Sequence, residues 1–512
     1  MQLKDLLEAL HEHGLRLERG GAEGEISSVT QDSRRVQPGA LFVAVRGASF
    51  DGHVFVDEAL HKGAAAVLVD RGTELPSADG RVLSVPDTGA VLGRLGAAFF
   101  GNPSRELDVV GVTGTNGKTT VSYLVEAIAR AAGREVGVIG TINNRWKGRE
   151  VPTVNTTPDG LALHGRLREM ADDGVDLVVM EISSHGLALG RVDGVAVDVG
   201  LFTNLTRDHL DFHQTMEAYR DAKRALFTRV LPGRQKRLGL RAVAVINLDD
   251  DEGRALKTLL SVHPELEVVG YAAEADAAEL RATRVQMSVE GTSLTVAGQG
   301  ANLELAVALQ GAFNVSNVLA AVGAARALGI PDEAIRQGLA DLPGVRGRLE
   351  RVCGPPGSPA VFVDYAHTPD ALERVLETLR PVVTGRLHVV FGCGGDRDRD
   401  KRAPMGRIAS QLADRIVMTS DNPRSEEPLA IIEAIAAGVV ERPGLEVDQE
   451  VSRERAIARA IATAGPEDAL LIAGKGHETY QEINGKRRDF NDVEIAERLL
   501  RERSKREQQG EE

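Results

Sequence analysis

The sequence has few cysteines, few aromatic residues and no excess of positive charge, and each lack excludes a class of protein. Its 512 residues include two cysteines, Cys353 and Cys393, too few for a disulfide framework or a cysteine metal site, so a reducing cytoplasm is expected. Aromatic residues make up 4% of the chain, which leaves little material for base-stacking platforms. The formal net charge of −14 argues against a nucleic-acid partner, because phosphates require a basic protein face.

Long hydrophobic runs are also missing. No apolar stretch approaches the about 18 residues needed to span a bilayer, so no membrane insertion is expected. The first residues, MQLKDLLEALHEHG, are interrupted by charges and predict an amphipathic helix rather than a signal peptide. With 42% hydrophobic and 27% charged residues, the composition indicates a globular, cytoplasmic protein.

The stretch VVGVTGTNGKTT, residues 109–120, predicts a phosphate-binding loop. Its apolar lead, Leu107–Val112, predicts a buried strand, and a helical pattern follows and stops at Gly133. A glycine-rich turn between strand and helix points backbone N–H groups at phosphate oxygens. Lys118 would reach the terminal phosphates, and the Thr119 hydroxyl would bind Mg²⁺.

This loop is the short G-x-x-G-K-T form, because Val112 occupies the position of the usual first glycine. A plain loop of Gly, Asn and Lys is the alternative interpretation. The strand before it and the helix after it favour nucleotide binding.

The length allows about three domains, because single cores stop growing near ~250–300 residues. Breaker clusters at Gly101–Ser104 and Asp341–Gly344 predict regions 1–102, 103–342 and 343–512. Each region alternates short apolar runs with helical stretches, which predicts α/β units, with a parallel, doubly wound sheet in the second. Residues 284–309 alternate around turn residues and predict an antiparallel side sheet, followed by a helix from about Val315 to Leu328. The other predicted strands are Ala40–Val45, Ala64–Val69, Arg81–Val85, Val136–Ile142, Val175–Ile182, Val195–Phe202, Ala242–Leu248, Ala360–Val363, Leu387–Phe391, Arg415–Thr419 and Ala469–Ile472.

Six polar clusters follow predicted strands directly, where open α/β sheets bind their ligands. They are residues 181–185, 204–213, 364–369, 392–402, 421–424 and 474–478. Each alone is also compatible with a polar loop, and a helix-capping serine pair beside a surface Glu181 is an alternative for the first. His209 and His213 are spaced to share a helix face, and one of them is expected to be structural. Four clusters in the third region together predict a pocket for a zwitterionic ligand, with Arg424 able to bind a carboxylate.

Motifs along nearly the whole chain, from residue 1 to about 500, resemble those of the Mur ligases, ATP-dependent amide-forming enzymes of peptidoglycan precursor synthesis. The motifs are DSRRVQPGALFVA, GTNGKTT, NTTPDG, MEISSHGL, NLTRDHLDFH, YRDAKRALF, GAFNVSNVLAA, VDYAHTPDAL, GCGGDRDRDKR, SDNPR and AGKGHE. The resemblance implies an α/β architecture of three domains: an N-terminal domain for the UDP-substrate, a central P-loop domain with a parallel sheet for ATP, and a Rossmann-like C-terminal domain for the amino acid.

The resemblance also implies a reaction. It joins meso-diaminopimelate to the D-glutamate γ-carboxylate of UDP-N-acetylmuramoyl-L-alanyl-D-glutamate through an acyl phosphate. ATP is the co-substrate, Mg²⁺ is the cofactor, and the expected state is a monomer.

The resemblance assigns roles to matching residues in three groups. Residues matching the UDP-substrate site are Ser33, Asn155, Thr156, Thr157, Ser183 and Arg191. Residues matching the ATP site are Gly114, Thr115, Asn116, Gly117, Lys118, Thr119, Thr120, Asn314, Arg348 and Asp364. Residues matching the amino-acid pocket are Arg397, Asp421, Asn422, Pro423, Arg424, Gly474 and Glu478.

Lys223 lies in the helical stretch MEAYRDAKRALF. From the sequence alone it is expected to be a solvated cation. The resemblance instead implies a carbamylated lysine, an anion that helps to place Mg²⁺ together with Thr119, Glu181 and His209. The resemblance therefore makes Lys118, Lys223, Glu181 and His209 the expected catalytic residues.

The Asp-Asn-Pro-Arg stretch at residues 421–424 resembles that of relatives that use diaminopimelate. The Arg424 guanidinium would pair with the distal carboxylate of diaminopimelate and repel the side-chain ammonium of lysine. Lysine or ornithine use stays an alternative.

Two other functions are compatible with the phosphate loop. A folylpolyglutamate synthetase-like ligase shares the loop and the amide chemistry, but the N-terminal DSRRVQPGALFVA stretch and the DNPR stretch argue against it. A P-loop switch or regulatory ATPase would bind nucleotide and a partner protein without making a bond.

Overall fold

The structure is a computed structural model that describes residues 1–11, 24–47, 50–73, 80–233, 241–275, 277–298 and 302–509. The chain forms two compact units: the first contains Met1–Arg281, Ala297–Ala301 and Ser316–Gly338, and the second contains Ala282–Val296, Asn302–Val315 and Leu339–Glu512. The division into three regions at residues 102 and 342 stays a prediction. Within the described ranges, no helix is both long enough and apolar enough to cross a membrane.

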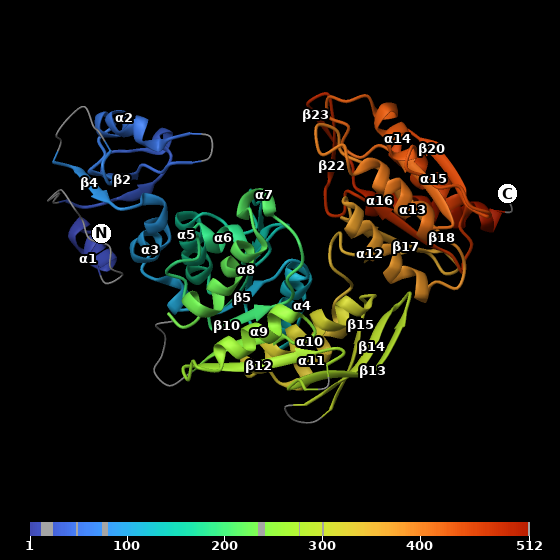
Figure 1. The fold of residues 1–512 in the computed structure, drawn as a ribbon, viewed down its shortest axis with the longest axis horizontal. Helices are drawn as coiled ribbons and strands as arrows, with labels where there is room; N and C mark the ends of the chain where they lie inside the picture. Colours follow the sequence, from blue (N-terminus) through green and yellow to red (C-terminus); the bar gives the residue numbers. More distant parts are fainter. Residues whose placement is uncertain are drawn as a thin grey trace. The chain divides into compact units, whose positions relative to one another are not determined.

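The N-terminal part of the first unit (blue in Figure 1) contains a parallel sheet, and its strand order is β1-β2-β3-β4. Its elements are α1 (Leu3–His11), β1 (Ser28–Thr30), η1 (Ser33–Arg35), β2 (Ala40–Val43), η2 (Gly52–Phe55), α2 (Val56–His61), β3 (Ala66–Asp70), β4 (Val82–Val85) and α3 (Thr88–Phe99). The predicted strands are confirmed as β2, β3 and β4. The predicted N-terminal helix is confirmed as α1, and residues 12–14 of that stretch lie outside the described residues.

The larger sheet of the first unit has the strand order β12-β11-β10-β5-β9-β6-β7-β8. The pairings from β12 to β6 are parallel, and β7 and β8 are antiparallel. Its strands are β5 (Asp108–Thr113), β6 (Val136–Ile139), β7 (Asn144–Trp146), β8 (Arg149–Val151), β9 (Leu177–Glu181), β10 (Val199–Phe202), β11 (Ala242–Asn247) and β12 (Leu266–Ala272). The short helix η3 (Pro103–Arg105) precedes β5. The helices after β5 are, in chain order, α4 (Lys118–Ala131), α5 (Gly160–Asp172), α6 (Ser184–Ala188), α7 (Leu210–His213), α8 (Met216–Ala225), the π-helix η4 (Leu226–Val230), α9 (Asp251–Leu260), α10 (Ala312–Ala327) and α11 (Asp332–Asp341).

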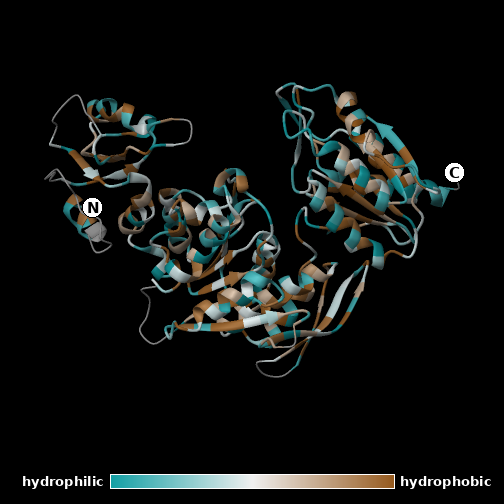
Figure 2. Cartoon of the chain, in the orientation of Figure 1, coloured by the Kyte–Doolittle hydropathy of each residue, from teal (hydrophilic) through white to brown (hydrophobic). Residues whose placement is uncertain are grey.

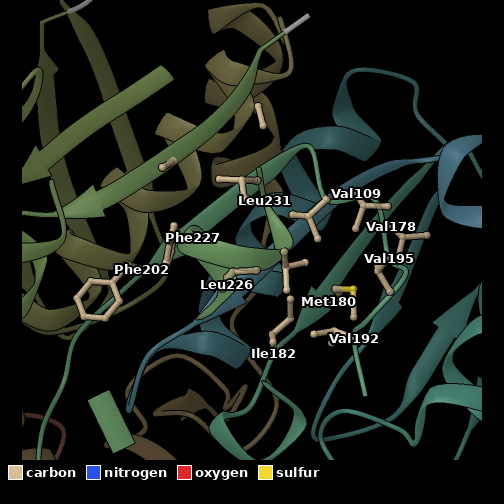
Figure 3. Close-up of a cluster of buried hydrophobic side chains, with 14 of the residues drawn as sticks. Val109, Val178, Met180, Ile182, Val192, Val195, Phe202, Leu226, Phe227 and Leu231 are labelled. Carbon is tan, nitrogen blue, oxygen red and sulfur yellow. The ribbon is translucent and has the colours of Figure 1, made fainter. Parts of the chain in front are cut away.

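Strand β5 lies between β9 and β10 and supports the phosphate loop. Every residue of β5 after Asp108 is buried. A parallel strand that is covered on both faces is buried along its length and therefore has a mainly apolar sequence. This is why the apolar run before the phosphate loop predicts the strand. In the core of this sheet, Val109 of β5 clusters with Met180 of β9 and Phe202 of β10 (Figure 3). The loop after β5 therefore starts from a rigid strand.

Three strands follow β12 in the chain: β13 (Leu280–Ser288), β14 (Gly291–Ala297) and β15 (Leu303–Val307). Strand β13 begins parallel to β12 at Leu280 and Arg281. Strands β14 and β15 are antiparallel, and buried and exposed residues alternate along β15. The predicted antiparallel strands in residues 284–309 are thereby confirmed, as is the following helix, α10.

The C-terminal part of the second unit is a sheet with the order β16-β17-β21-β18-β19-β20, parallel except for β16. Its elements are β16 (Glu350–Arg351), β17 (Ala360–Asp364), α12 (Pro369–Leu379), η5 (Arg380–Val382), β18 (Leu387–Phe391), α13 (Arg402–Leu412), β19 (Arg415–Thr419), α14 (Pro428–Ala436), β20 (Glu446–Glu450), α15 (Arg453–Thr463), β21 (Ala469–Ala473), β22 (Tyr480–Ile483), β23 (Lys486–Asp489) and α16 (Asp492–Gln509). Every residue of the inner strands β17, β18 and β21 is buried, and most of these residues are hydrophobic, the brown end of the scale in Figure 2. All four strands predicted here are confirmed.

Strands that lack an apolar run are not predicted from the sequence. Among the described strands, β20, with the sequence EVDQE, pairs with β19 alone at the sheet edge, and it is mostly exposed. The hairpin of β22 and β23 has a polar sequence, but its Asn484-Gly485 turn is a signal that could have revealed it.

Candidate active site

The phosphate loop leaves β5 at Thr113 and enters α4 at Lys118, as the sequence predicts. Gly114 and Gly117 have φ of +145° and +88°. A Cβ at Gly114 would lie 1.9 Å from the Thr203 Oγ1 atom, and one at Gly117 would lie 2.4 Å from the Asn317 Oδ1 atom. Both positions therefore require glycine for conformation and for space.

The segment after β10 holds this loop in place. The backbone N–H of Thr115 donates to the Asn204 carbonyl at 2.8 Å, and that of Asn116 donates to Asn204 Oδ1 at 2.9 Å. The Thr203 hydroxyl donates to the Asn116 carbonyl at 2.6 Å. The polar cluster after β10 thus supports the loop, a role that its sequence does not reveal.

Two lysines converge on the loop. Lys118 Nζ donates to the carbonyls of Gly114 and Thr115, each at 2.8 Å, and Lys223 Nζ donates to the Gly114 carbonyl at 2.7 Å. Lys223 lies in α8 and is 2% exposed, so the expectation of a solvated cation is wrong. Burial, and next the positive charge of Lys118, hold the pKa of Lys223 well below its usual value.

Glu181 ends β9 beside the loop and is buried, so the alternative of a surface glutamate is wrong. Its Oε2 atom accepts from the hydroxyls of Thr119 at 2.9 Å and Thr141 at 2.8 Å, and its Oε1 atom accepts from the Thr141 N–H at 3.0 Å. Ser183 nevertheless caps α6, as that alternative proposed, because its hydroxyl accepts from Gly186 N–H.

These oxygen groups fit Mg²⁺, which is held by one or two carboxylates with waters and substrate phosphates. Thr119 and Glu181 place a hydroxyl and a carboxylate together at the first turn of α4. Among the described residues, no three His, Cys, Asp or Glu side chains are grouped to hold a metal. An ion here would therefore depend on these oxygens and on groups of the substrates.

His209 is the N-cap residue of α7, with a left-handed φ of +52°, and the His213 N–H donates to its carbonyl at 3.0 Å, so the two histidines lie one turn apart. The His209 ring lies 4.9 Å from that of His185 and 6.0 Å from that of Tyr219, the ring that Lys223 Nζ also approaches, at 4.6 Å. In the described structure His209 forms no hydrogen bond with Glu181. His213 is buried and bonded to the Ser184 hydroxyl at 2.9 Å, and it is the structural histidine of the pair.

Most residues expected to bind the UDP-linked substrate gather beside Glu181. The Thr157 hydroxyl donates to the Glu181 carbonyl and accepts from the Ser183 N–H, and Arg191 Nη1 donates to the Thr157 carbonyl. The Thr156 hydroxyl meets that of Thr141 at 3.1 Å. Two residues complete the set: Asn155, which is exposed in the preceding loop, and Ser33, which lies in η1 of the N-terminal sheet.

In the second unit, the other expected nucleotide-binding residues lie on separate elements. Asp364 ends β17 and accepts from the backbone N–H groups of Leu349 and Ala366, each at 2.7 Å. Burial raises the pKa of Asp364, and the charge of Arg348 opposes that shift. Asn314 is buried in α10 and donates to the Gln310 carbonyl at 2.8 Å.

The residues expected to bind the amino acid lie where β18, β19 and β21 end. Asn422 donates to Glu478 Oε2 at 2.8 Å, and a Cβ at Gly474, whose φ is +116°, would lie 2.5 Å from Asp421 Oδ2. Arg424 Nη1 donates to the Gly395 carbonyl at 2.6 Å.

The loop after β18 lies against the same stretch. A Cβ built at Gly394 would lie 3.0 Å from Arg424 Nη1 and 3.8 Å from Arg397 Cγ, so the two arginines flank this glycine. A Cβ at Gly395 would meet the Pro423 carbonyl at 2.0 Å. Residues from three strand ends are thus brought together.

Lys475 contacts these expected amino-acid-binding residues as well. Its ammonium group is fully buried and donates to Asn422 Oδ1 at 3.2 Å and Glu478 Oε2 at 3.1 Å. It orients two of the expected pocket residues. The only indication in the sequence is that this lysine lies between two glycines directly after a predicted strand. That pattern is equally compatible with an ordinary loop.

Comparison with known proteins identifies the family. A model of the Mur ligase family catalytic domain matches residues 25–100, one of the Mur ligase middle domain matches 112–325, and one of the Mur ligase glutamate ligase domain matches 347–476. The chain belongs to the Mur ligase family. The fold expected for Mur ligases is thereby confirmed.

Relatives of this Mur ligase share most of its length. A Bacillus licheniformis protein named UDP-N-acetylmuramoyl-L-alanyl-D-glutamate–2,6-diaminopimelate ligase is 44% identical over 483 residues, which cover 94% of this chain and 96% of that protein. A solved structure of a ligase with the same name is 34% identical, with a TM-score of 0.72, and covers 93% of this chain and 94% of its own. Folylpolyglutamate synthase from Mycobacterium tuberculosis is 21% identical, with a TM-score of 0.58 over 74% of this chain and 91% of its own, and it shares the fold alone.

The burial of Lys223 predicts a pH-dependent stability. Between its lowered pKa and its usual value of 10.5, the unfolded chain holds a proton that the folded chain does not. We therefore expect the stability of the wild type relative to Lys223→Met to fall as pH is lowered from 10 toward 7. Urea unfolding in carbonate-free buffer, followed by the fluorescence of the single tryptophan, Trp146, measures this difference.

The control is Lys4→Met, which removes an exposed lysine ammonium. A stability difference between wild type and Lys223→Met that stays constant over this pH range would contradict the assignment of a neutral, buried amine.

Proposed function

We propose that this chain is an ATP-dependent ligase that joins meso-diaminopimelate to the D-glutamate γ-carboxylate of UDP-N-acetylmuramoyl-L-alanyl-D-glutamate in peptidoglycan synthesis. The observation that carries the proposal is the 44% identity, over 94% of the chain, to a relative named for this reaction. The folylpolyglutamate synthetase-like alternative is weaker, because its structural similarity comes with only 21% identity.

The phosphate loop supports an acyl phosphate mechanism. Hydroxide is a poor leaving group, so a γ-carboxylate oxygen of the substrate first attacks the γ-phosphorus of ATP, and ADP leaves. The neutral amine of diaminopimelate then attacks the acyl carbon and loses its proton, and phosphate leaves. Lys118, whose Nζ lies over the loop carbonyls, would neutralise charge on the transferring phosphoryl group.

In this proposal Thr119 and Glu181 would hold Mg²⁺, and carbamylated Lys223 would help to place a second ion alongside Glu181 and His209. The bound metal would supply positive charge for phosphoryl transfer. The shared hydrogen bond of Thr119 and Glu181 supports the first assignment, and the approach of His209 and Lys223 to Tyr219 supports the second.

The environment of Lys223 supports carbamylation. A buried amine with a lowered pKa is uncharged and can attack CO₂, forming an N–C bond and releasing one proton. The product is an anion beside the Lys118 ammonium, so the two groups attract each other.

The C-terminal pocket supports a ligand with charges of both signs. Arg424 and Arg397 would bind the distal carboxylate of diaminopimelate, and Asp421 and Glu478 would bind its ammonium group. We further propose a monomer that works in the cytoplasm, which agrees with two free cysteines, Cys353 and Cys393.

The reaction is tested by mixing the protein with ATP, Mg²⁺ and the UDP-muramoyl-dipeptide, and adding meso-diaminopimelate, L-lysine or L-ornithine. We expect phosphate release to require both substrates and to be fastest with diaminopimelate, with a product heavier by one diaminopimelate minus water. Phosphate release that is indifferent to both substrates would instead support the switch or regulatory ATPase.

Lys223→Ala is expected to lower kcat by roughly 100-fold or more, and bicarbonate should not rescue it, because the anion is lost. Mass spectrometry of the active wild type should find the mass of one CO₂ on Lys223. Lys4→Ala, at an exposed lysine, is the control. A fully active enzyme with an unmodified Lys223 would refute carbamylation.

Arg424→Ala is expected to raise the KM for diaminopimelate by roughly 10- to 100-fold and to leave the KM for ATP nearly unchanged, because a charge-assisted pair is lost. Steady-state kinetics with each substrate varied measures both constants. Arg407→Ala, at an exposed arginine of α13, is the matched control. Equal increases for both substrates would count against the pocket.

A further inference from the structure

The hairpin of β22 and β23 has a rigid turn that its sequence specifies. Ile483 pairs with Lys486, so only Asn484 and Gly485 form the turn, and their φ values are +50° and +70°. Two positive φ values are typical of the type I′ turn, which favours Asn-Gly because it matches the twist of the strands. The hairpin is therefore a defined element that can support a neighbour.

The neighbour is the Asp-Asn-Pro-Arg stretch of the candidate amino-acid pocket, residues 421–424. Two hydrogen bonds tie the hairpin to its first half: Gln481 Nε2 donates to the Asp421 carbonyl at 2.7 Å, and Glu482 N–H donates to Asn422 Oδ1 at 2.9 Å. Gln481 is only 1% exposed, and its Oε1 accepts from Arg488, so its amide has one orientation.

Two more hydrogen bonds hold Arg424 itself. Its backbone N–H donates to the Glu482 carbonyl at 3.1 Å, and its carbonyl accepts from the Asn484 N–H at 2.7 Å. Together they form an isolated parallel bridge between Arg424 and Ile483. The hairpin turn thus supplies a direct partner for the arginine backbone.

Arg424 needs such support because its φ is +50°, in the left-handed region. A side-chain-bearing residue persists there only where its surroundings fix it. Its guanidinium donates to the Gly395 carbonyl, and in the described structure no carboxylate pairs with it. The backbone conformation therefore decides where this positive charge lies in the pocket.

We propose that the β22–β23 hairpin sets the amino-acid selectivity of the enzyme by holding Arg424 in this conformation, with Gln481 and Asn484 as positioning residues. The inference rests on the proposed function. A released Arg424 keeps its charge but loses its defined position, so the bidentate pairing with the distal carboxylate of diaminopimelate weakens. L-Lysine lacks that carboxylate and loses nothing.

The test replaces both turn residues, in Asn484→Ala/Gly485→Ala, because alanine disfavours positive φ. We expect the ratio of kcat/KM for meso-diaminopimelate over L-lysine to fall by about tenfold, through the KM for diaminopimelate, with the KM for ATP unchanged within about twofold. Asn484→Gly keeps the turn geometry and should retain the wild-type ratio. Gln481→Met, which removes the amide at similar volume, should lower the ratio in the same direction.

The matched control is Lys147→Ala/Gly148→Ala, because the β7–β8 turn also has two positive φ values, +45° and +75°. This variant should leave the selectivity ratio unchanged. In an Arg424→Ala background, the Asn484→Ala/Gly485→Ala change should cause no further loss of the ratio, because the hairpin acts through that arginine.

An undiminished effect of the turn in the Arg424→Ala background, or equal increases in KM for every substrate, would overturn the positioning role. A wild-type selectivity ratio in Asn484→Ala/Gly485→Ala would do the same. A wild type that fails to ligate diaminopimelate would contradict the proposed function itself, so the two failures are distinguishable.

Discussion

The carbonyl of Gly114 accepts hydrogen bonds from two lysines, so the electrostatics of the phosphate loop depend on the charges of these two side chains. Lys118 and Lys223 cannot both be ammonium ions there without strong repulsion, because Lys223 is buried and water does not screen it. The structure relieves this by lowering the pKa of Lys223. The proposed carbamate would relieve it further, by placing an anion next to Lys118.

In both units, the candidate site residues lie at the carboxyl ends of parallel strands. The phosphate loop follows β5, and Glu181 ends β9. In the second unit Asp364 ends β17, and Asp421 and Gly474 come after β19 and β21. In such sheets the carboxyl ends of neighbouring strands lie at one edge, so polar residues far apart in sequence become neighbours. The rigid strands therefore fix the positions of these polar residues, although the loops that carry them have little regular structure.

Much of this was predictable from the sequence, for one physical reason. Inner parallel strands are buried on both faces, so β5, β9, β18 and β21 have mainly apolar sequences, which indicate the strand and the polar cluster at its end. Strand β20 is an edge strand with a polar sequence and gives no such signal. The Asn484-Gly485 sequence does predict a hairpin turn, but the local sequence does not indicate which loop the hairpin will contact.

The sequence by itself determined the phosphate loop, the α/β class and the family, because these depend on local patterns and motifs. The tertiary structure alone decided the state of particular side chains. Lys223 follows an ordinary helical pattern, and only packing against the loop makes it a buried amine. Arg424 is readable as a cation, but its left-handed backbone depends on a hairpin almost sixty residues later in the chain. Burial and long-range hydrogen bonds are properties of the folded chain, which no local stretch contains.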